Sequence, residues 1–257
     1  IPAFMEPRSV VCDPTGEQTV VWSATQVPHL LRLMLALTVG MPEHKLRVIA
    51  PDVGGGFGGK LQVTPEEVLT LLAARHTGKP CKWTETRSES LLSAHHGRDQ
   101  WQRLTLAADT NGIVTALKVQ LLADMGAYLG LVTPGVPILG AFMFNAIYKF
   151  PAYRFECSTI FTNKTWTDAY RGAGRPEATF AIERLMDELA VEVGVDPLEI
   201  RERNWIKHEE FPFTSVCGLE YDSGNYELAT AKAKELFDYD GLRAEQAEDI
   251  AAFGFGA

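Results

Sequence analysis

One stretch stands out in this 257-residue chain: Ala50-Pro51-Asp52-Val53-Gly54-Gly55-Gly56-Phe57-Gly58-Gly59-Lys60. Five of the six residues from 54 to 59 are glycine. Glycine at this density permits positive φ angles and close backbone approach, although it raises the entropic cost of ordering the loop. Successive exposed N–H groups in such a loop can form a concave anion site. The stretch therefore predicts a loop that lies against a ligand or another backbone.

The loop formally contains Gly54-x-Gly56-x-x-Gly59, a dinucleotide fingerprint, and Gly54-x4-Gly59-Lys60, most of a phosphate-binding loop. Both motifs require a helix that opens on the last glycine, so that the helix N-terminus meets the phosphate. Here the capping pattern predicts a helix that begins several residues later. The phosphate loop also needs Ser or Thr after the lysine, where this chain has Leu61. A nucleotide-binding domain and a purely structural glycine loop remain two alternatives.

Hydrophobic periodicity and turn residues predict the elements on either side of this loop. Strands are expected at 19–22, 46–49, 82–84 and 154–162, a hairpin at 100–108 and 113–122 around Asn111-Gly112, and helices at 28–39, 64–75, 88–94, 176–193, from 196, and at 226–237. Along 176–193 we expect Phe180, Leu185, Met186 and Leu189 to face inward. Regular strand–helix alternation is absent after residue 80, so an α+β fold with mixed sheets and packed helices is predicted rather than a doubly wound sheet.

Composition narrows the class of protein. The formal net charge of −9 argues against nucleic-acid binding, which needs a basic surface. The apolar stretch 129–144 is broken by proline and glycine, so no membrane span is expected. Four separated cysteines without a Cys-x-x-Cys pair predict reduced, buried thiols and a cytoplasmic protein, not a metal cluster held by this chain.

The chain is expected to be the first part of one domain, 1–257, with a weak boundary near Thr165 where strands give way to helices. It begins without Met and stops at 253–257 without a helix cap or a polar tail. We therefore expect both ends to be cuts in a longer protein, with the C-terminal remainder missing.

Several separated motifs together resemble the large subunits of the xanthine oxidase and carbon monoxide dehydrogenase family, the molybdenum hydroxylases. The glycine loop is similar to that family's loop, and three more segments match in order and spacing. They are Met5-Glu6-Pro7-Arg8, Trp22-Ser23-Ala24-Thr25-Gln26-Val27-Pro28-His29 and Asp168-Ala169-Tyr170-Arg171-Gly172-Ala173-Gly174-Arg175-Pro176-Glu177. Agreement of several separated motifs is far more specific than any one of them.

The resemblance implies a molybdenum-dependent oxidoreductase subunit that binds molybdopterin, in the cytosine dinucleotide form. It would hydroxylate an aldehyde or heteroaromatic carbon of a small molecule, with water as the oxygen source, and the cofactor would carry the chemistry. FAD and 2Fe–2S clusters would lie on partner chains, a medium and a small subunit, within a higher oligomer of heterotrimers. A non-catalytic assembly piece, which folds around partners without chemistry, is the third alternative.

The resemblance also implies roles for individual residues. Gln26 is expected to hydrogen-bond the apical oxo ligand of molybdenum, because an amide donates without adding charge. Arg171 is expected to approach the metal's oxygen ligands or the substrate, so both are candidate catalytic residues. The expected cofactor contacts are Gln26, Gly56, Phe57, Gly58, Arg171, Gly172 and Ala173. Of these, Gln26, Phe57 and Arg171 would lie near the metal without being its side-chain ligands, and no metal role is expected for His29, His95 or His96.

The chain departs from two branches of the family it resembles. Copper-containing carbon monoxide dehydrogenases carry cysteine directly after the loop arginine, where this chain has Gly172. Purine-oxidising members carry glutamate after the glycine-loop lysine and phenylalanine in the arginine loop, where this chain has Leu61 and Ala173. These differences disfavour carbon monoxide and xanthine as substrates. The family's general-base glutamate would lie beyond residue 257, so the 257 residues alone are expected to be inactive.

Overall fold

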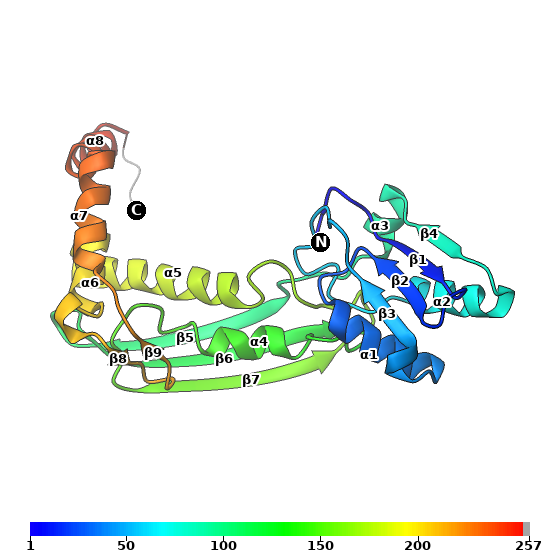
Figure 1. The fold of residues 1–257 in the computed structure, drawn as a ribbon. Helices are drawn as coiled ribbons and strands as arrows, with labels where there is room; N and C mark the ends of the chain where they lie inside the picture. The colour runs from blue at the N-terminus through cyan, green and yellow to red at the C-terminus, as the bar shows by residue number, and fades with distance from the viewer. Residues whose placement is uncertain (254–257) are drawn as a thin grey trace. The chain divides into compact units, whose positions relative to one another are not determined.

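The computed structural model describes residues 1–253, with side chains described through residue 250 (Figure 1). Its internal contacts define two compact units, each built from three segments. The first unit comprises Ile1–Arg103, Gln120–Ala141 and Glu156–Ala178, and the second comprises Leu104–Val119, Phe142–Phe155 and the chain from Thr179 onward. Thr165 lies inside the first unit, and a single domain over 1–257 with a boundary near that residue stays a prediction.

A four-stranded sheet forms the framework of the first unit. Its strands are β1 (Ser9–Asp13), β2 (Thr19–Ser23), β3 (Leu46–Ile49) and β4 (Cys81–Thr84), in the order β3-β2-β1-β4. β2 and β3 are parallel, whereas β1 is antiparallel to both β2 and β4. This mixed pairing confirms the α+β prediction. β1, which occupies an interior position of the sheet, was not predicted from the sequence.

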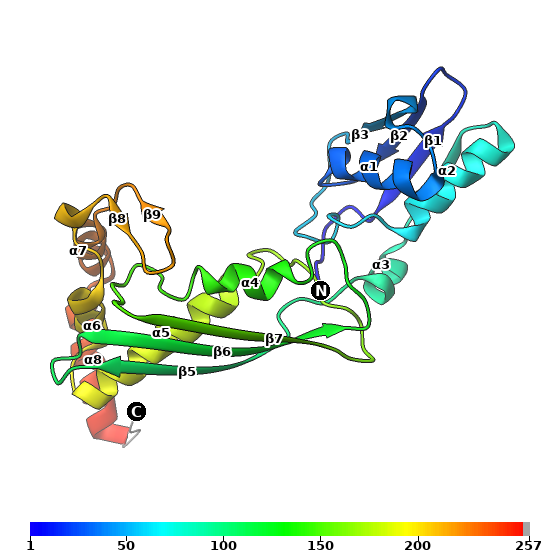
Figure 2. The same ribbon diagram turned by 90° about the horizontal axis from the view of Figure 1, so that it is seen from below.

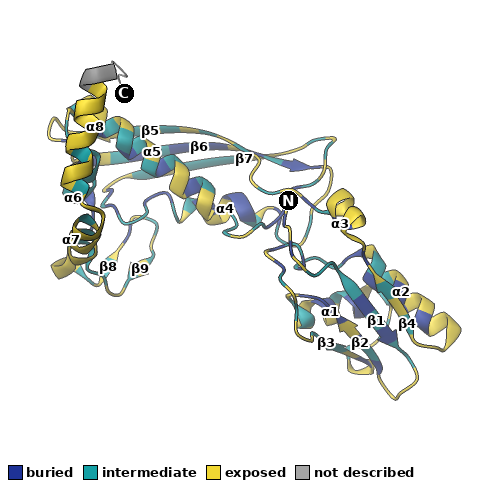
Figure 3. Ribbon diagram, turned by 90° about the horizontal axis from the view of Figure 1, so that it is seen from above, coloured by how far each residue is buried: buried dark blue, intermediate teal, exposed yellow. Residues whose placement is uncertain are grey.

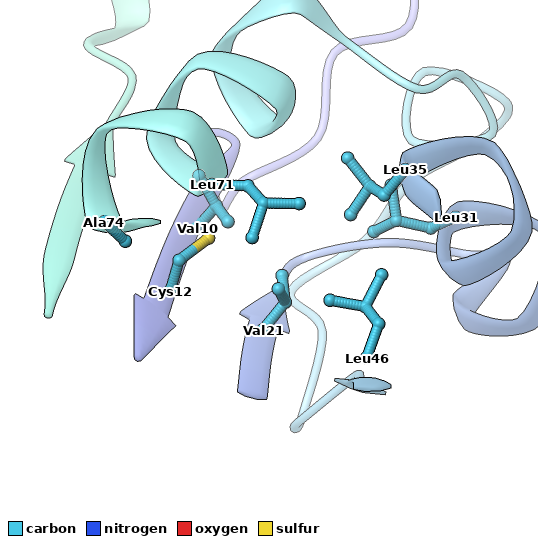
Figure 4. Close-up of a cluster of buried hydrophobic side chains, with 8 residues drawn as sticks. All are labelled: Val10, Cys12, Val21, Leu31, Leu35, Leu46, Leu71 and Ala74. Carbon is cyan, nitrogen blue, oxygen red and sulfur yellow. The ribbon is translucent and has the colours of Figure 1, made fainter. Parts of the chain in front are cut away.

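Two helices, α1 (Pro28–Val39) and α2 (Pro65–Thr77), cover one face of this sheet (Figure 2). Figure 4 shows the side chains that meet between the two layers, all at most 1% exposed: Val10, Cys12, Val21, Leu31, Leu35, Leu46, Leu71 and Ala74. Burying one leucine side chain is worth about 1.5–3 kcal/mol, so this cluster contributes substantially to the stability of the unit. Burial also raises the pKa of the Cys12 thiol to about 12.

Local signals set where these helices begin and end. The backbone N–H of Thr64 donates to the Glu67 carboxylate at 2.9 Å, which confirms the capping box that opens α2. Gly40 ends α1 with φ 63° and donates its N–H to the Ala36 carbonyl. A short helix, α3 (Arg87–Ser93), is capped by Thr86 and begins one residue earlier than the predicted range 88–94.

Three longer strands form a second sheet in the order β5-β6-β7, and each contributes residues to both units. They are β5 (Gln100–Ala108), β6 (Val114–Gly126) and β7 (Tyr153–Phe161). The predicted turn between β5 and β6 is confirmed. The Asp109 carboxylate accepts from the N–H groups of Asn111 and Ile113, each at 2.9 Å, and Gly112 takes φ 78°. Asn111 keeps a negative φ, so this is not the two-residue turn in which both central residues are left-handed.

The apolar stretch 129–144 contains one short helix, α4 (Gly135–Ala141). Within the part of the chain that the structure describes, no helix is long and apolar enough to cross a membrane. Of the four cysteines, Cys12 is buried and the other three are partly exposed. The expectation of buried thiols therefore holds for Cys12 but is wrong for the rest.

The remaining elements are four helices, two short strands and two 3-10 turns. They are α5 (Arg175–Val193), α6 (Pro197–Asn204), α7 (Tyr226–Phe237), α8 (Tyr239–Phe253), β8 (Phe213–Thr214), β9 (Glu220–Tyr221), η1 (Glu43–Lys45) and η2 (His208–Glu210). Asp196 caps α6 by accepting from the Leu198 N–H at 2.7 Å, as its sequence predicts. α8 was not predicted, because its charged residues carry little apolar periodicity.

Buried and exposed positions alternate along α5 (Figure 3). The fully buried positions repeat every four residues: Ala178, Ile182, Met186 and Ala190. The inward assignment of Met186 is confirmed, but that of Phe180 is wrong, since 71% of its side chain is exposed. Position 180 lies two residues from 178 and 182, about 200° around the helix and therefore on the opposite face.

Candidate functional site

The glycine loop follows β3 and connects it to α2. It folds back on itself through turns, in which the Gly59 N–H donates to the Gly56 carbonyl at 2.8 Å and the Leu61 N–H to the Gly58 carbonyl at 3.2 Å. The helix begins at Pro65, not at the last glycine. The loop therefore lacks the helix N-terminus that both nucleotide motifs require.

Lys60, the residue that would reach a phosphate in a nucleotide-binding loop, is buried. Its ammonium lies 2.7 Å from the Glu6 carboxylate and 4.8 Å from the centre of the Phe4 ring, and its side chain is 0% exposed. Burial alone would raise the pKa of Glu6, but hydrogen bonds from Lys60 and the Gly54 N–H outweigh it and lower that pKa. Lys60 thus anchors the loop to the N-terminal segment instead of facing a ligand.

Gln26, three residues after the end of β2, is held against this loop at three points. Its Oε1 accepts from the N–H groups of Gly58 at 3.0 Å and Lys60 at 3.2 Å, and its own N–H donates to the Lys60 carbonyl at 3.0 Å. Two donors on Oε1 fix the orientation of the amide. Among the described residues its Nε2 has no acceptor, so it remains a neutral donor of fixed position. A Cβ at Gly56 would lie 2.2 Å from Oε1, which explains the absence of a side chain there.

The second predicted loop, which precedes α5, lies directly against the first. The Arg171 N–H donates to the Phe57 carbonyl at 3.0 Å, and the Arg171 guanidinium lies 5.8 Å from the centre of the Phe57 ring. A Cβ at Gly58 would lie only 2.0 Å from the Ala169 carbonyl oxygen. The structure thus brings Gln26, Phe57 and Arg171 together through the single peptide group that joins Phe57 and Gly58.

The backbone of both loops is unusual where they meet. Phe57 and Ala173 take φ 50° and 46°, and the neighbouring glycines Gly58 and Gly172 take φ 96° and 103°. Residues other than glycine are strained in this region, and such strain concentrates at functional sites. Within the described chain, the N–H groups of Gly56, Phe57 and Gly172 donate to no acceptor. With the Gln26 amide and the Arg171 guanidinium, they form a donor-rich set suited to a ligand with many oxygen acceptors.

Two buried residues that were not predicted as site residues, Asp168 and His95, form hydrogen bonds that hold the Arg171 loop in place. The Asp168 carboxylate is fully buried and accepts from the Thr133 hydroxyl at 2.7 Å and the Val132 N–H at 3.3 Å. His95 Nε2 lies 2.9 Å from the Ala169 carbonyl, which can only accept, so this nitrogen donates. Burial lowers the pKa of His95, which keeps the ring neutral at neutral pH.

Arg98 is a further supporting residue that sequence reasoning missed. Its guanidinium donates to the Arg171 carbonyl and to the Glu177 carboxylate, and it lies 4.7 Å from the centre of the Tyr170 ring. Arg175, on the same helix, donates to the Gly172 carbonyl at 3.3 Å, and Glu177 pairs with Arg98. A partner 73 residues away leaves no local signal in the sequence.

The described residues contain no group of three or more His, Cys, Asp or Glu side chains that could hold a metal ion.

Comparison with known proteins places this geometry in context. The profile of a family described as "Molybdopterin cofactor-binding domain" matches residues 1–205. The chain is 37% identical over 238 residues to the carbon monoxide dehydrogenase large chain of Hydrogenophaga pseudoflava, covering 91% of this chain and 30% of that protein. It is 37% identical over 251 residues to the nicotine 6-hydroxylase large subunit of Paenarthrobacter nicotinovorans, with 96% and 30% covered.

Solved structures give the same picture. Quinoline 2-oxidoreductase from Pseudomonas putida 86 superposes with a TM-score of 0.90 at 38% identity, covering 97% of this chain and 32% of that one. The aldehyde oxidoreductase from Desulfovibrio gigas superposes with a TM-score of 0.74 at 30% identity, covering 85% and 24%. The chain therefore spans about a third or less of the length of the relatives it matches.

Proposed function

This chain belongs to the molybdopterin cofactor-binding domain family. We propose that the glycine loop 54–60 and the loop 168–174 before α5, called the paired loops, together hold a molybdopterin in the cytosine dinucleotide form. The complete protein would be the large subunit of a molybdenum hydroxylase. The observation that carries the proposal is the convergence of Gln26, the Phe57–Gly58 peptide and Arg171 through consecutive hydrogen bonds. Three segments far apart in the sequence supply one continuous line of contacts.

The chemistry of these N–H donors fits this group. A molybdenum–pterin cofactor presents oxygen ligands and phosphates, all of them acceptors, and the loops offer unfilled N–H groups at Gly56, Phe57 and Gly172. Glycine at these turns lets the backbone approach a ligand without an intervening side chain. When bound, the cofactor would supply the oxidative hydroxylation of a carbon centre with water as the oxygen source.

Each residue would bind or orient. The Nε2 of Gln26 would donate to an oxygen beside the metal, since its Oε1 is already committed to Gly58 and Lys60. The Arg171 guanidinium would add a positive charge, because no carboxylate among the described residues neutralises it. Gly172 and Ala173 would line the same face through their backbone. None of these groups need be a direct ligand of the metal.

The alternative of a nucleotide-binding ATPase-like domain loses its support. Its essential lysine is fully buried in an ion pair with Glu6. A phosphate would have to displace that carboxylate and draw Lys60 out of contact with Phe4.

The substrate proposed is an aldehyde or a heteroaromatic ring of a small molecule. At position 172, where copper-dependent relatives are expected to carry cysteine, a Cβ would lie 2.4 Å from the Pro176 ring, and φ is 103°. This backbone is therefore unsuited to a cysteine side chain. Relatives named for nicotine and quinoline fit the heteroaromatic class.

The complete enzyme proposed is a cytoplasmic oligomer of heterotrimers. Its small subunit would carry 2Fe–2S clusters and its medium subunit FAD, and these would remove the electrons. The 257 residues alone would be inactive. The alternative is a non-catalytic assembly role, in which the complete complex would form but would bind no cofactor.

The test is to purify the full-length subunit with its partners and measure molybdenum together with the nucleotide released by acid. We expect about one molybdenum and one cytidine monophosphate per large subunit, and loss of activity after cyanide treatment. Turnover in ¹⁸O-labelled water should place the label in the product. A well-folded complex without molybdenum would reject the proposal, and the assembly role would then be favoured.

A further inference from the structure

We infer that Arg98 is a positioning residue that fixes the orientation of the peptide joining Arg171 and Gly172, and so presents the Gly172 N–H to the ligand of the paired loops. The inference rests on the proposed function, because it assumes that this N–H faces a bound cofactor. Its evidence lies in contacts that surround one peptide group.

The geometry of a peptide group links the Arg98 contact to the direction of the Gly172 N–H. In a trans peptide the C=O and the following N–H point in opposite directions. The Arg171 carbonyl accepts a hydrogen bond from the Arg98 guanidinium. The Gly172 N–H must therefore point away from Arg98, and it has no acceptor among the described residues. Rotation of this peptide would exchange the donor for a carbonyl oxygen, which would repel an oxygen-rich ligand.

The backbone at this point does not hold that orientation by itself. Gly172 takes φ 103°, and glycine populates positive and negative φ about equally, so the peptide can rotate at small intrinsic cost. Ala173 takes φ 46°, in a region that non-glycine residues adopt only when their surroundings impose it. A specific contact is needed to select one orientation, and Arg98 makes it.

Arg98 is itself held in place. Its backbone takes φ 62°, its guanidinium lies over the Tyr170 ring, and a second nitrogen pairs with Glu177 at 3.1 Å. Glu177 lies in the first turn of α5 and is 10% exposed, and its other carboxylate oxygen is buried without a partner in the described chain. The planar guanidinium reaches the carbonyl and the carboxylate at once, which a lysine ammonium cannot do in the same geometry.

The same contact reaches Gln26 through the backbone. Arg98 fixes the Arg171 carbonyl, and the Arg171 N–H donates to the Phe57 carbonyl. The N–H of that same peptide, on Gly58, donates to Gln26 Oε1. The last two hydrogen bonds are in series through the Phe57–Gly58 peptide, and hydrogen bonds in series polarise one another. Arg98 binds the other peptide group of Arg171, so it acts on this series through the position of the Arg171 backbone.

The experiment uses the full-length holoenzyme with its partners and the variants Arg98→Ala and Arg98→Lys. With molybdenum content equal to that of the parent, we expect kcat to fall about 10- to 100-fold in Arg98→Ala, as for other residues that orient a metal's ligands, with little change in KM. The electron paramagnetic resonance spectrum of half-reduced molybdenum should change shape. Added guanidinium ion should restore part of kcat in Arg98→Ala, and Arg98→Lys should be impaired without rescue.

Arg103→Ala is the matched control, since it removes an exposed guanidinium that also stacks on a ring, that of Trp101, but contacts neither loop. It should leave kcat and the spectrum unchanged. If Arg98→Ala fails to fold because Glu177 is left unpaired, the pair Arg98→Ala/Glu177→Gln is compared with Glu177→Gln alone.

Parent-like kcat and spectrum in the Arg98 variants at full molybdenum content would overturn the inference. So would a crystal structure of Arg98→Ala with the 171–172 peptide in its original orientation. Absence of molybdenum from the parent complex would instead reject the proposed function, so the two failures are distinguishable.

Discussion

The hydrophobic core between the four-stranded sheet and its two helices differs from the paired loops in how its polar and apolar groups are satisfied. Between the sheet and its two helices, apolar side chains such as Leu31 and Leu71 are completely buried. In the loops, the N–H groups of Gly56, Phe57 and Gly172 have no acceptor among the described residues, and Phe57 and Ala173 hold strained backbone angles. The core gains stability from burial, whereas the loops retain unmet hydrogen-bonding capacity and strain. The comparison indicates that the loops are shaped for a ligand and that the core keeps them in place.

The largest effect is expected from Gly58→Ala. Its Cβ would lie 2.0 Å from the Ala169 carbonyl, so the two loops must separate. Molybdenum content and activity of the complex should fall at least about 100-fold, since small displacements near a reacting centre cost that much. Gly40→Ala is the control, because it also has positive φ but meets nothing within 4 Å. It should lower stability without loss of molybdenum, and equal molybdenum loss in both variants would contradict the paired-loop interpretation.

A core substitution should affect stability alone. Leu71→Ala is expected to lower the free energy of unfolding by about 2–5 kcal/mol, because it leaves a cavity between α2 and the sheet. Activity per bound molybdenum should not change. Leu69→Ala on the same helix is the matched control, since 62% of that side chain is exposed. Chemical denaturation measures the free energy of unfolding, and a molybdenum assay gives the activity per bound metal. A changed kcat per molybdenum in Leu71→Ala would contradict the expectation that the core affects stability alone.

A substitution that removes one hydrogen-bond donor from the paired loops should lower activity and leave stability unchanged. Gln26→Glu keeps an oxygen to accept from Gly58 and Lys60 but loses the Nε2 donor. We expect kcat to fall about 100-fold, the usual effect of losing one preorganised donor, with no loss of thermal stability. Gln18→Glu is the control, because its amide donates to the His44 carbonyl on the exposed surface. A Gln26→Glu enzyme with full activity would show that this donor does not face the reacting group.

The smallest effect concerns pH. Burial lowers the pKa of His95 below its ordinary 6.5, so the folded protein binds fewer protons than the unfolded chain between those two values. The stabilisation from neutral His95 is complete above about pH 6.5 and declines as pH falls from there through the lowered pKa. His95→Gln, which can still donate to the Ala169 carbonyl, should show a shallower decline in melting temperature between about pH 6.5 and 5. Identical slopes for the two proteins would exclude this contribution.

Sequence patterns predicted those parts of the molecule whose signals are local. The strands around β2, β3 and β4, the capping box at Thr64 and the Asn111-Gly112 hairpin follow from residues within a few positions of one another. The convergence of Gln26, Phe57 and Arg171 came from a family resemblance, because no local pattern encodes it. The structure brings these residues together, and their roles toward a cofactor stay a prediction.

The failures share a physical cause. Phe180 was assigned inward from its hydrophobicity, although the buried stripe of α5 lies on the opposite face. Lys60 stands at the lysine position of a phosphate-binding loop, but it pairs with Glu6, 54 residues away. Arg98 and His95 act on carbonyls more than 70 residues distant. Tertiary contacts of this kind decide whether a charged residue binds a ligand or stabilises the fold, and they leave no local pattern in the sequence.

A crystal structure of the molybdenum-loaded complex is the most direct measurement of where the cofactor lies. We predict oxygen atoms of the cofactor within hydrogen-bonding distance of Gln26 Nε2 and the Gly172 N–H, with the Arg171 guanidinium beside them. A cofactor bound elsewhere, with these three donors turned to solvent, would contradict the assignment of the paired loops.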